Sequence, residues 1–166
     1  MDSLRRPSKS TRKPAAKVDA IALLKADHRQ VKGWFAEYEK ASSLAHKQEL
    51  AKKICQALRM HTTIEEEIFY PAFLAVTQDK DLHHEACVEH GAAKQLIGKI
   101  EASDPSDDYF DARVKVLSEM IKHHVKEEEQ PGGMFAEARK CGMDLKELGA
   151  QLKARKQGPP AVSAEK

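Results

Sequence analysis

Two histidine–glutamate pairs in this sequence have the spacing of metal ligands on a helix. Glu65 follows His61 by four residues, and Glu128 follows His124 by four residues. Because residues four apart project from the same helix face, each pair can present an imidazole and a carboxylate to one site. A buried carboxylate is costly unless it is paired or binds a cation. Imidazole and carboxylate ligands without thiolate suit iron or manganese, whereas zinc usually takes a tetrahedral site with fewer ligands.

Two further histidines, His28 and His90, lie within stripes of aliphatic residues. A single histidine in such a stripe is more often a hydrogen-bonded core residue than a ligand. One on each of four helices, twice with glutamate four residues on, favours metal binding. We expect the neighbouring glutamates to be solvated or to form ion pairs: Glu66, Glu67, Glu127 and Glu129. The other histidines, His46, His83, His84 and His123, are weaker ligand candidates, and the pair His123 and Glu127 ranks below His124 and Glu128 because it lies off the main stripe.

Hydrophobic periodicity predicts that each of the four inward histidines lies on its own helix. The predicted helices run from about 19 to 42, from 46 to 71, from 81 to 103 and from 106 to 130, and a short further helix runs from 144 to 152. We expect Pro71 to disturb the second helix. The expected inward stripe of that helix is Leu50, Ile54, Ala57, His61, Ile64 and Ile68. Strand-like alternation is absent, so the predicted fold class is all-α.

Short connections between these helices favour antiparallel neighbours and hence an up-down-up-down four-helix bundle. Counted along the sequence, the first two inward histidines are nearly equidistant from the turn near Leu44. The other two lie at similar distances on either side of the turn near Pro105. A helix rises about 1.5 Å per residue, so each pair agrees in height to within about one turn. All four histidines should therefore meet in one cross-section of the bundle.

The composition indicates one domain with two tails. We expect a basic disordered tail over residues 1–17, the bundle over 18–152 and a flexible tail over 153–166. Lysine and arginine number 28 against 26 aspartates and glutamates, which implies no general attraction to nucleic acid or to an acidic membrane. No apolar run has the length of a membrane span, and no secretory signal is recognisable.

Three cysteines, Cys55, Cys87 and Cys141, are widely spaced and form no CxxC motif. This spacing argues against a disulfide framework and against a thiolate zinc site. We therefore expect reduced thiols and a cytoplasmic location.

Four segments resemble the hemerythrin-like, or HHE cation-binding, domain. They are ADHRQVKGWF, HTTIEEEIFYP, VEHGAAKQLI and KHHVKEEEQPGGMF, and together they span most of residues 19 to 140. The resemblance implies a four-helix bundle that holds two non-haem iron ions, bridged by carboxylates and by an oxo or hydroxo group. In that arrangement the terminal ligands would be His28, His61, His90 and His124, and the bridging ligands would be Glu65 and Glu128. Members of the family bind dioxygen, sense oxygen or iron, resist nitric oxide or peroxide, or store metal.

One position departs from the pattern of the oxygen-carrying hemerythrins. These carry a further histidine four residues after the one on the third helix, and here that position is Lys94. Water, hydroxide or a neighbouring side chain could supply the missing ligand: Glu66, Glu89, Tyr70 or His84. An open position favours redox reactivity, sensing or iron handling over reversible oxygen carriage.

The leading functional hypothesis is a di-iron protein that binds or reacts with O2, peroxide or nitric oxide in redox stress response or sensing. Catalase-like or other redox activity would then occur at the metal, because the chain carries no recognisable nucleophile motif. A second hypothesis is an iron or oxygen sensor, or an iron-storage module, without catalysis. A third is a purely structural bundle whose core histidines bind nothing.

Overall fold

The computed structural model describes residues 18–158, and the predicted tail over 1–17 lies outside the described residues. The described elements are all helical: α1 (Ala20–Lys40), α2 (Leu44–Ile64), a π-helical turn η1 (Glu65–Phe69), α3 (Tyr70–Thr77), α4 (Lys80–Glu101), α5 (Phe110–Glu129), α6 (Met134–Lys140) and α7 (Leu145–Gln157). The all-α prediction is confirmed. None of these helices is both long enough and apolar enough to cross a bilayer.

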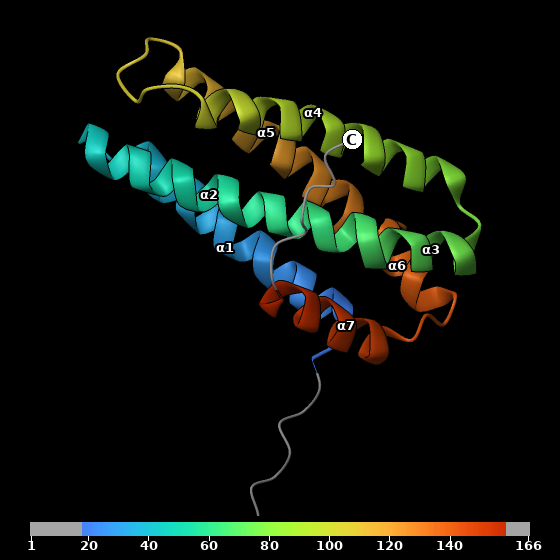
Figure 1. Cartoon of the computed structure of the whole chain (residues 1–166). Coiled ribbons are helices and arrows are strands. Elements are labelled where there is room, and N and C mark those ends of the chain that lie inside the picture. Colours follow the sequence, from blue (N-terminus) through green and yellow to red (C-terminus); the bar gives the residue numbers. More distant parts are fainter. Residues whose placement is uncertain (1–17, 159–166) are drawn as a thin grey trace, which may run out of the picture.

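Four long rods form the predicted up-down-up-down bundle (Figure 1). The first rod is α1, the second is α2 continued through η1 into α3, and the others are α4 and α5. The rod α1 packs against α2, and α4 packs against α5. Contacts of α2 with α4 and of α1 with α5 close the bundle.

Side-chain caps explain where three of these helices begin. The carboxylates of Asp19 and Asp79 and the hydroxyl of Ser43 each accept a hydrogen bond from a backbone N–H in the first turn that follows. The fourth helix was predicted to begin near 106, but α5 begins at Phe110. Asp107 is the reason, because its side chain accepts from the N–H of Tyr109, which stabilises a turn instead of a helix.

The prediction that Pro71 disturbs the second helix holds in part, because the regular α-helix ends at Ile64 and a π turn precedes the proline, but the rod continues through Pro71 into α3. In the preceding π turn, the N–H of Tyr70 donates to the carbonyl of Glu65 five residues earlier. A π turn adds one residue to the helix, and this wider turn accommodates a proline that lacks an N–H. The added residue also rotates the inward face, so Ile68 is only half-buried while Phe69 and its neighbour Tyr70 point into the core.

Two apolar clusters lie on either side of the inward histidines. One cluster contains Leu24, Ile64 and Met134, and the other contains Val31 and Leu58. His28, His61 and His90 are each bounded along their helices by apolar residues of both clusters, and His124 is bounded along α5 by residues of the second cluster. The histidines therefore lie in a belt from which bulk water is excluded.

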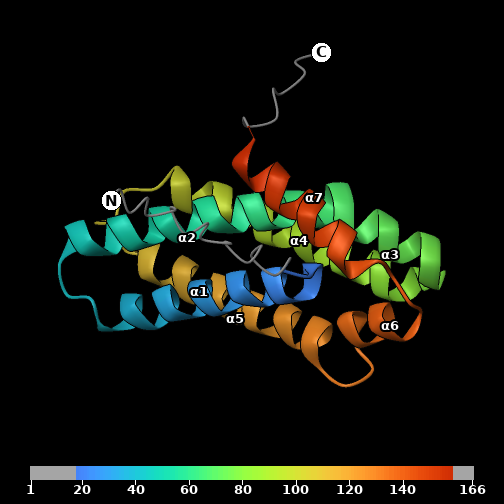
Figure 2. The same ribbon diagram turned by 90° about the horizontal axis from the view of Figure 1, so that it is seen from below.

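The helix α7 lies obliquely across the face of the bundle formed by α1 and by α2 with η1 (Figure 2). Asp144 caps it as predicted, and Leu152 is fully buried. A Cβ atom at Gly149 would lie 2.3 Å from a backbone carbonyl oxygen at the start of the chain's described part, so only glycine allows this approach. The helix α6 was not predicted.

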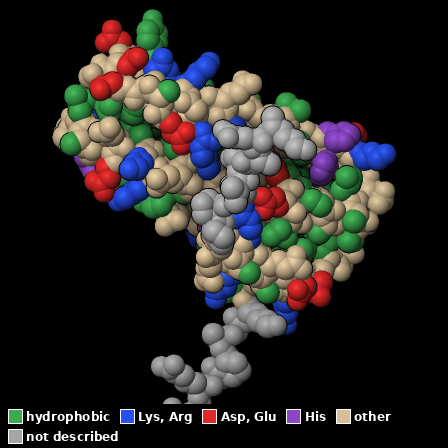
Figure 3. Space-filling view, viewed as in Figure 1, with side chains coloured by type: hydrophobic (Ala, Val, Ile, Leu, Met, Phe, Trp, Pro, Cys, Tyr) green, Lys and Arg blue, Asp and Glu red, His purple; other side chains and the backbone are tan. Residues whose placement is uncertain are grey.

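The flexible tail was predicted to begin at 153, but residues 153–157 are helical. Ion pairs hold this last turn against the bundle: Arg155 contacts Glu67, and Lys156 contacts Asp27. Elsewhere on the molecule, side chains of both charges are interspersed over the face seen in Figure 3.

Candidate metal centre

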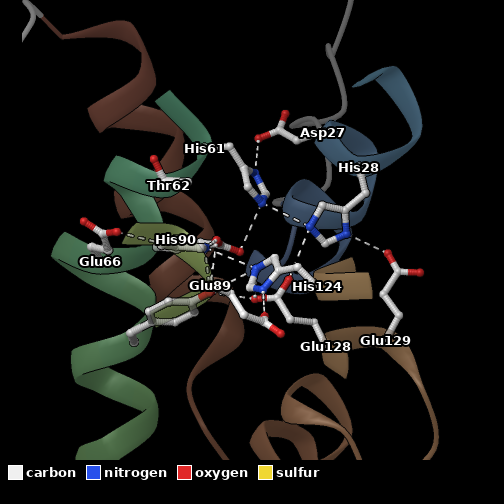
Figure 4. Close-up of polar contacts among 12 residues, drawn as sticks. Asp27, His28, His61, Thr62, Glu66, Glu89, His90, His124, Glu128 and Glu129 are labelled. Atoms are coloured by element: carbon white, nitrogen blue, oxygen red, sulfur yellow. Dashed lines mark hydrogen bonds and ion pairs between the residues drawn. The ribbon is translucent and has the colours of Figure 1, made fainter. Parts of the chain in front are cut away.

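The six predicted ligand residues come together inside the bundle, and all six are buried (Figure 4). They are His28 from α1, His61 from α2, Glu65 from η1, His90 from α4, and His124 and Glu128 from α5. Glu65 is 0% exposed and Glu128 is 1% exposed. A carboxylate pair this deep in an apolar belt requires compensating positive charge.

The imidazole rings face one another in two pairs through their Nε2 atoms. The Nε2 atoms of His28 and His61 are 3.0 Å apart, and those of His90 and His124 are 3.1 Å apart. Each inner carboxylate then joins the pairs. Glu65 places one oxygen 3.1 Å from Nε2 of His61 and the other 3.1 Å from Nε2 of His90.

Glu128 joins the other two histidines in the same way. Its oxygens lie 3.3 Å from Nε2 of His28 and 3.3 Å from Nε2 of His124. Two overlapping sets of potential ligands result, each with all of its ligand atoms within 4.8 Å of one another. The sets are His28, His61, Glu65 and Glu128, and Glu65, His90 and His124. Because both sets contain Glu65, the arrangement could hold two adjacent cations that share this carboxylate.

Two carboxylate oxygens in this cluster lack a donor. Glu65 Oε1 and Glu128 Oε2 are buried and accept no hydrogen bond, although a histidine ring lies within ion-pair distance of each. Buried polar atoms without partners are rare in folded proteins and call for an explanation. The donor set of four imidazole nitrogens and two carboxylates fits a pair of metal ions, which would satisfy both oxygens.

A second layer of carboxylates orients the four rings. The acceptors for the outer Nδ1 atoms are Asp27 for His61 (3.1 Å), Glu129 for His28 (2.8 Å), Glu66 for His90 (3.0 Å) and Glu89 for His124 (2.5 Å). A carboxylate only accepts, so it holds the proton on Nδ1 and leaves the Nε2 lone pair directed to the centre. Figure 4 shows these four carboxylates around the ring cluster.

From sequence, Glu66 and Glu129 were expected to be solvated or to form ion pairs, whereas Asp27 and the orienting role of Glu89 were missed. A signal was present, because each of these acidic residues is the immediate neighbour in sequence of one of the six inner residues. Each holds a histidine on a different helix, however. Sequence alone does not say which helix that is.

Comparison with known families identifies the kind of domain that holds this cluster. The family model described as hemerythrin HHE cation-binding domain matches residues 19–131. This chain belongs to that family. As a hemerythrin HHE domain protein it has a cation-binding site, and the clustered histidines and glutamates could hold the metal.

Two relatives of this HHE domain protein show how far the likeness extends. A crystal structure of a hemerythrin HHE cation-binding domain-containing protein from Mycobacterium kansasii superposes with a TM-score of 0.68 at 25% identity, covering 84% of this chain and 86% of the other. A protein of Nostoc sp. (strain PCC 7120 / SAG 25.82 / UTEX 2576), named as a DNA nickase, is 30% identical over 107 residues, 64% of this chain. The chain spans only 30% of the length of that curated relative.

Tyr70 occupies the middle of this HHE site. Its hydroxyl donates to Glu128 Oε1 at 2.8 Å and lies 3.0 Å from Nε2 of His90. The π turn is what brings it there, since it aligns Tyr70 with Glu65, five residues earlier, on one face. Burial and the charges of the two glutamates raise the pKa of Tyr70 well above its usual value, so the phenol keeps its proton.

Lys94, at the position of the additional histidine in oxygen carriers, does not enter the centre. Its Nζ donates to Glu66. Among the suggested substitutes for that histidine, Glu66 and Glu89 contact the outer ring atoms, and His84 is exposed. Only Tyr70 reaches the central Nε2 atoms.

In the metal-free protein, the inner histidines and glutamates form ion pairs with one another. Burial disfavours a charged His61, but the charge of Glu65 and the contact with Asp27 outweigh it and raise the pKa of His61 to about 10. Burial and the charge of Glu65 oppose ionisation of Glu128, yet contacts with histidines lower its pKa to about 2. Protons on the imidazoles thus supply positive charge that a metal would otherwise provide.

Proposed function

We propose that this protein holds two non-haem iron ions, with His28, His61, His90 and His124 as terminal ligands and Glu65 and Glu128 as bridging ligands. The observation that carries this proposal is the pair of buried glutamate oxygens without a donor, set among four Nε2 atoms. Mixed imidazole and carboxylate donors without thiolate suit iron. The shared Glu65 favours two ions over one.

We further propose that the centre binds or reacts with O2, peroxide or nitric oxide, in redox stress response or sensing. Iron, when bound, supplies a one-electron couple and an open coordination position. A cavity of about 20 Å³ lies beside the four histidines, with a wall that includes Val31, Leu58, Ile121 and Val125. A space of that size accommodates about one water-sized molecule, which suits these small ligands and excludes larger substrates.

The protein's own groups have separate tasks in this proposal. The outer carboxylates fix the tautomer and direction of the rings. The two apolar clusters keep bulk water from the centre. Tyr70 holds a proton at Oη within the site, where it can donate to a bound ligand. Three cysteines, each a free thiol, favour a reducing compartment such as the cytoplasm.

The test is metal analysis of protein purified without oxygen, combined with its ultraviolet–visible spectrum before and after air or peroxide. We expect about two irons per chain and a charge-transfer band that changes on exposure. His124→Ala should lose both the iron and the charge-transfer band, whereas the control change His46→Ala, at a histidine that pairs with Glu37 away from the centre, should retain them. A folded chain that contains only zinc or no metal, and that iron reconstitution leaves unchanged, would refute the proposal.

A further inference from the structure

Two of the four outer carboxylates are themselves bound by lysines. Lys94, on α4, donates to Glu66, and Lys156, on α7, donates to Asp27. Each carboxylate uses its other oxygen to hold Nδ1 of an inward histidine. The result is two chains of contacts, each running from an ammonium group through a carboxylate and an imidazole to the centre.

Both lysine chains end on the same side of the centre. Glu66 holds His90 and Asp27 holds His61, and these are the two histidines whose Nε2 atoms lie 3.1 Å from the oxygens of Glu65. The other half of the centre is different. Within the described part of the chain, neither Glu89 nor Glu129 forms an ion pair with a lysine or arginine.

The charges of the whole assembly are consistent with two divalent ions. The two inner and four outer carboxylates carry six negative charges, and the two lysines compensate two of them. Four negative charges remain, as many as two divalent cations neutralise, with the imidazoles neutral as ligands. The outer carboxylates are only 15% to 33% exposed, so solvent screens these charges incompletely.

We propose that Lys94 and Lys156 set the charge of the centre so that it favours two divalent ions, and that they act through Glu66 and Asp27. This inference rests on the proposed metal centre. Removing either lysine leaves one uncompensated negative charge at the Glu65 half of the site. Trivalent iron then becomes more favourable there, because added negative charge stabilises the more positive ion.

Lys156 lies outside the residues that the family model matches, which end at 131. The proposed effect on the charge of the centre thus depends in part on α7, a helix that follows the matched HHE domain. Lys94 stands where the oxygen carriers place a neutral ligand. Both lysines are therefore features of this chain in addition to the general ligand set.

The first experiment is a redox titration of iron-loaded protein, followed by its charge-transfer band. We expect Lys94→Met and Lys156→Met each to raise the ratio of ferric to ferrous iron at a fixed potential by about two- to thirtyfold. Coulomb's law gives this range for a unit charge taken to act over roughly 8 Å, with an effective dielectric constant between that of water and that of a protein surface. The double variant should combine both effects, since the lysines act on different carboxylates.

Two control variants separate charge from helix packing. Arg155→Met removes the neighbouring ion pair of α7, whose partner Glu67 contacts no histidine in the described structure. Lys99→Met removes an exposed lysine of α4. Both controls should titrate like the wild type. A shift in Arg155→Met equal to that in Lys156→Met would overturn the proposal, because docking of α7 would then explain the effect.

A second readout uses Co(II) alone in competition with a chelator. The lysine variants should bind Co(II) at least as tightly as the wild type, because a repelling cation has been removed. If the lysines only stabilise the packing of the helices, their removal should weaken Co(II) binding. The double variant Asp27→Asn/Lys156→Met restores the total charge, so it should return the ratio of ferric to ferrous iron toward that of the wild type. A purely structural role of Lys156 does not predict this return.

The outcomes distinguish this inference from the proposed function. A wild-type protein that binds neither iron nor Co(II) would overturn both. A wild-type protein with two irons and lysine variants that titrate unchanged would overturn the charge-setting role alone. A lowered Co(II) affinity with an unchanged redox ratio would likewise assign the lysines a structural role.

Discussion

Replacing Tyr70 by phenylalanine removes the single hydroxyl at the centre of the site. In the metal-free protein this hydroxyl is the donor to Glu128 Oε1 at 2.8 Å, while Oε2 of the same carboxylate already has no donor. Loss of a hydrogen bond to a buried charged group costs about 1.5–3 kcal/mol. For a chain of this size, each kcal/mol lowers the melting temperature by about 2–4 °C, so we expect a decrease of about 3–12 °C.

The assay is thermal unfolding of metal-free Tyr70→Phe followed by circular dichroism. Tyr38→Phe is the matched control, because Tyr38 is also buried and donates at 2.7 Å to a carboxylate, that of Asp111. The side chain of Asp111 is 63% exposed and also contacts Lys47. Removing the Tyr38 hydroxyl should therefore lower the free energy of unfolding by less than about 1 kcal/mol. Equal decreases for both variants, or none for Tyr70→Phe, would refute the reasoning about the central hydroxyl.

Three further predictions concern the shared ligand, the pH and the last helix. Glu65→Gln should reduce bound iron to below one ion per chain, as measured by mass spectrometry, because both ligand sets contain this carboxylate. The pKa of His61 is raised from 6.5 to about 10, so its contribution to the stability of the metal-free protein is present below pH 6.5 and lost toward pH 10. The pKa of Glu128 is lowered from 4.5 to about 2, so its contribution is present above pH 4.5 and lost toward pH 2. Urea unfolding of the metal-free protein should therefore give maximal stability between about pH 4.5 and 6.5. A midpoint urea concentration that keeps rising above pH 6.5 would contradict the stabilising role of the charged His61. Gly149→Ala should destabilise by about 1–3 kcal/mol, because its Cβ would meet backbone at 2.3 Å, whereas Gly33→Ala, which meets nothing, should be neutral or stabilising in the same denaturation assay.

The inward faces of the helices and the level of the histidines along the bundle could be predicted from the sequence. Helical periodicity is a local property, so the spacing of His61 and Glu65 indicates a shared face in any fold that keeps the helix. Short connections impose antiparallel neighbours, and the similar distances from the turns then place the rings at one level. All six predicted residues accordingly meet in the structure.

The π turn was not accessible in this way. One additional residue shifts the inward face from Ile68 to Phe69 and Tyr70, and Pro71 then lies within a continuous rod instead of at its end. A π turn occurs as a single widened turn inside an α-helix, frequently at a functional site, and what the rotated side chains contact decides whether it forms. Tyr70 finds four polar partners in the centre, which local pattern does not reveal.

The sequence by itself determined which residue types face inward and at what height, because these follow from the geometry of single helices. Only the tertiary structure decided which carboxylate orients which ring and that Lys156, distant in sequence, reaches Asp27. Each of these contacts depends on the rotation and separation of two different helices. Those quantities result from the packing of the whole core, and no short stretch of sequence encodes them.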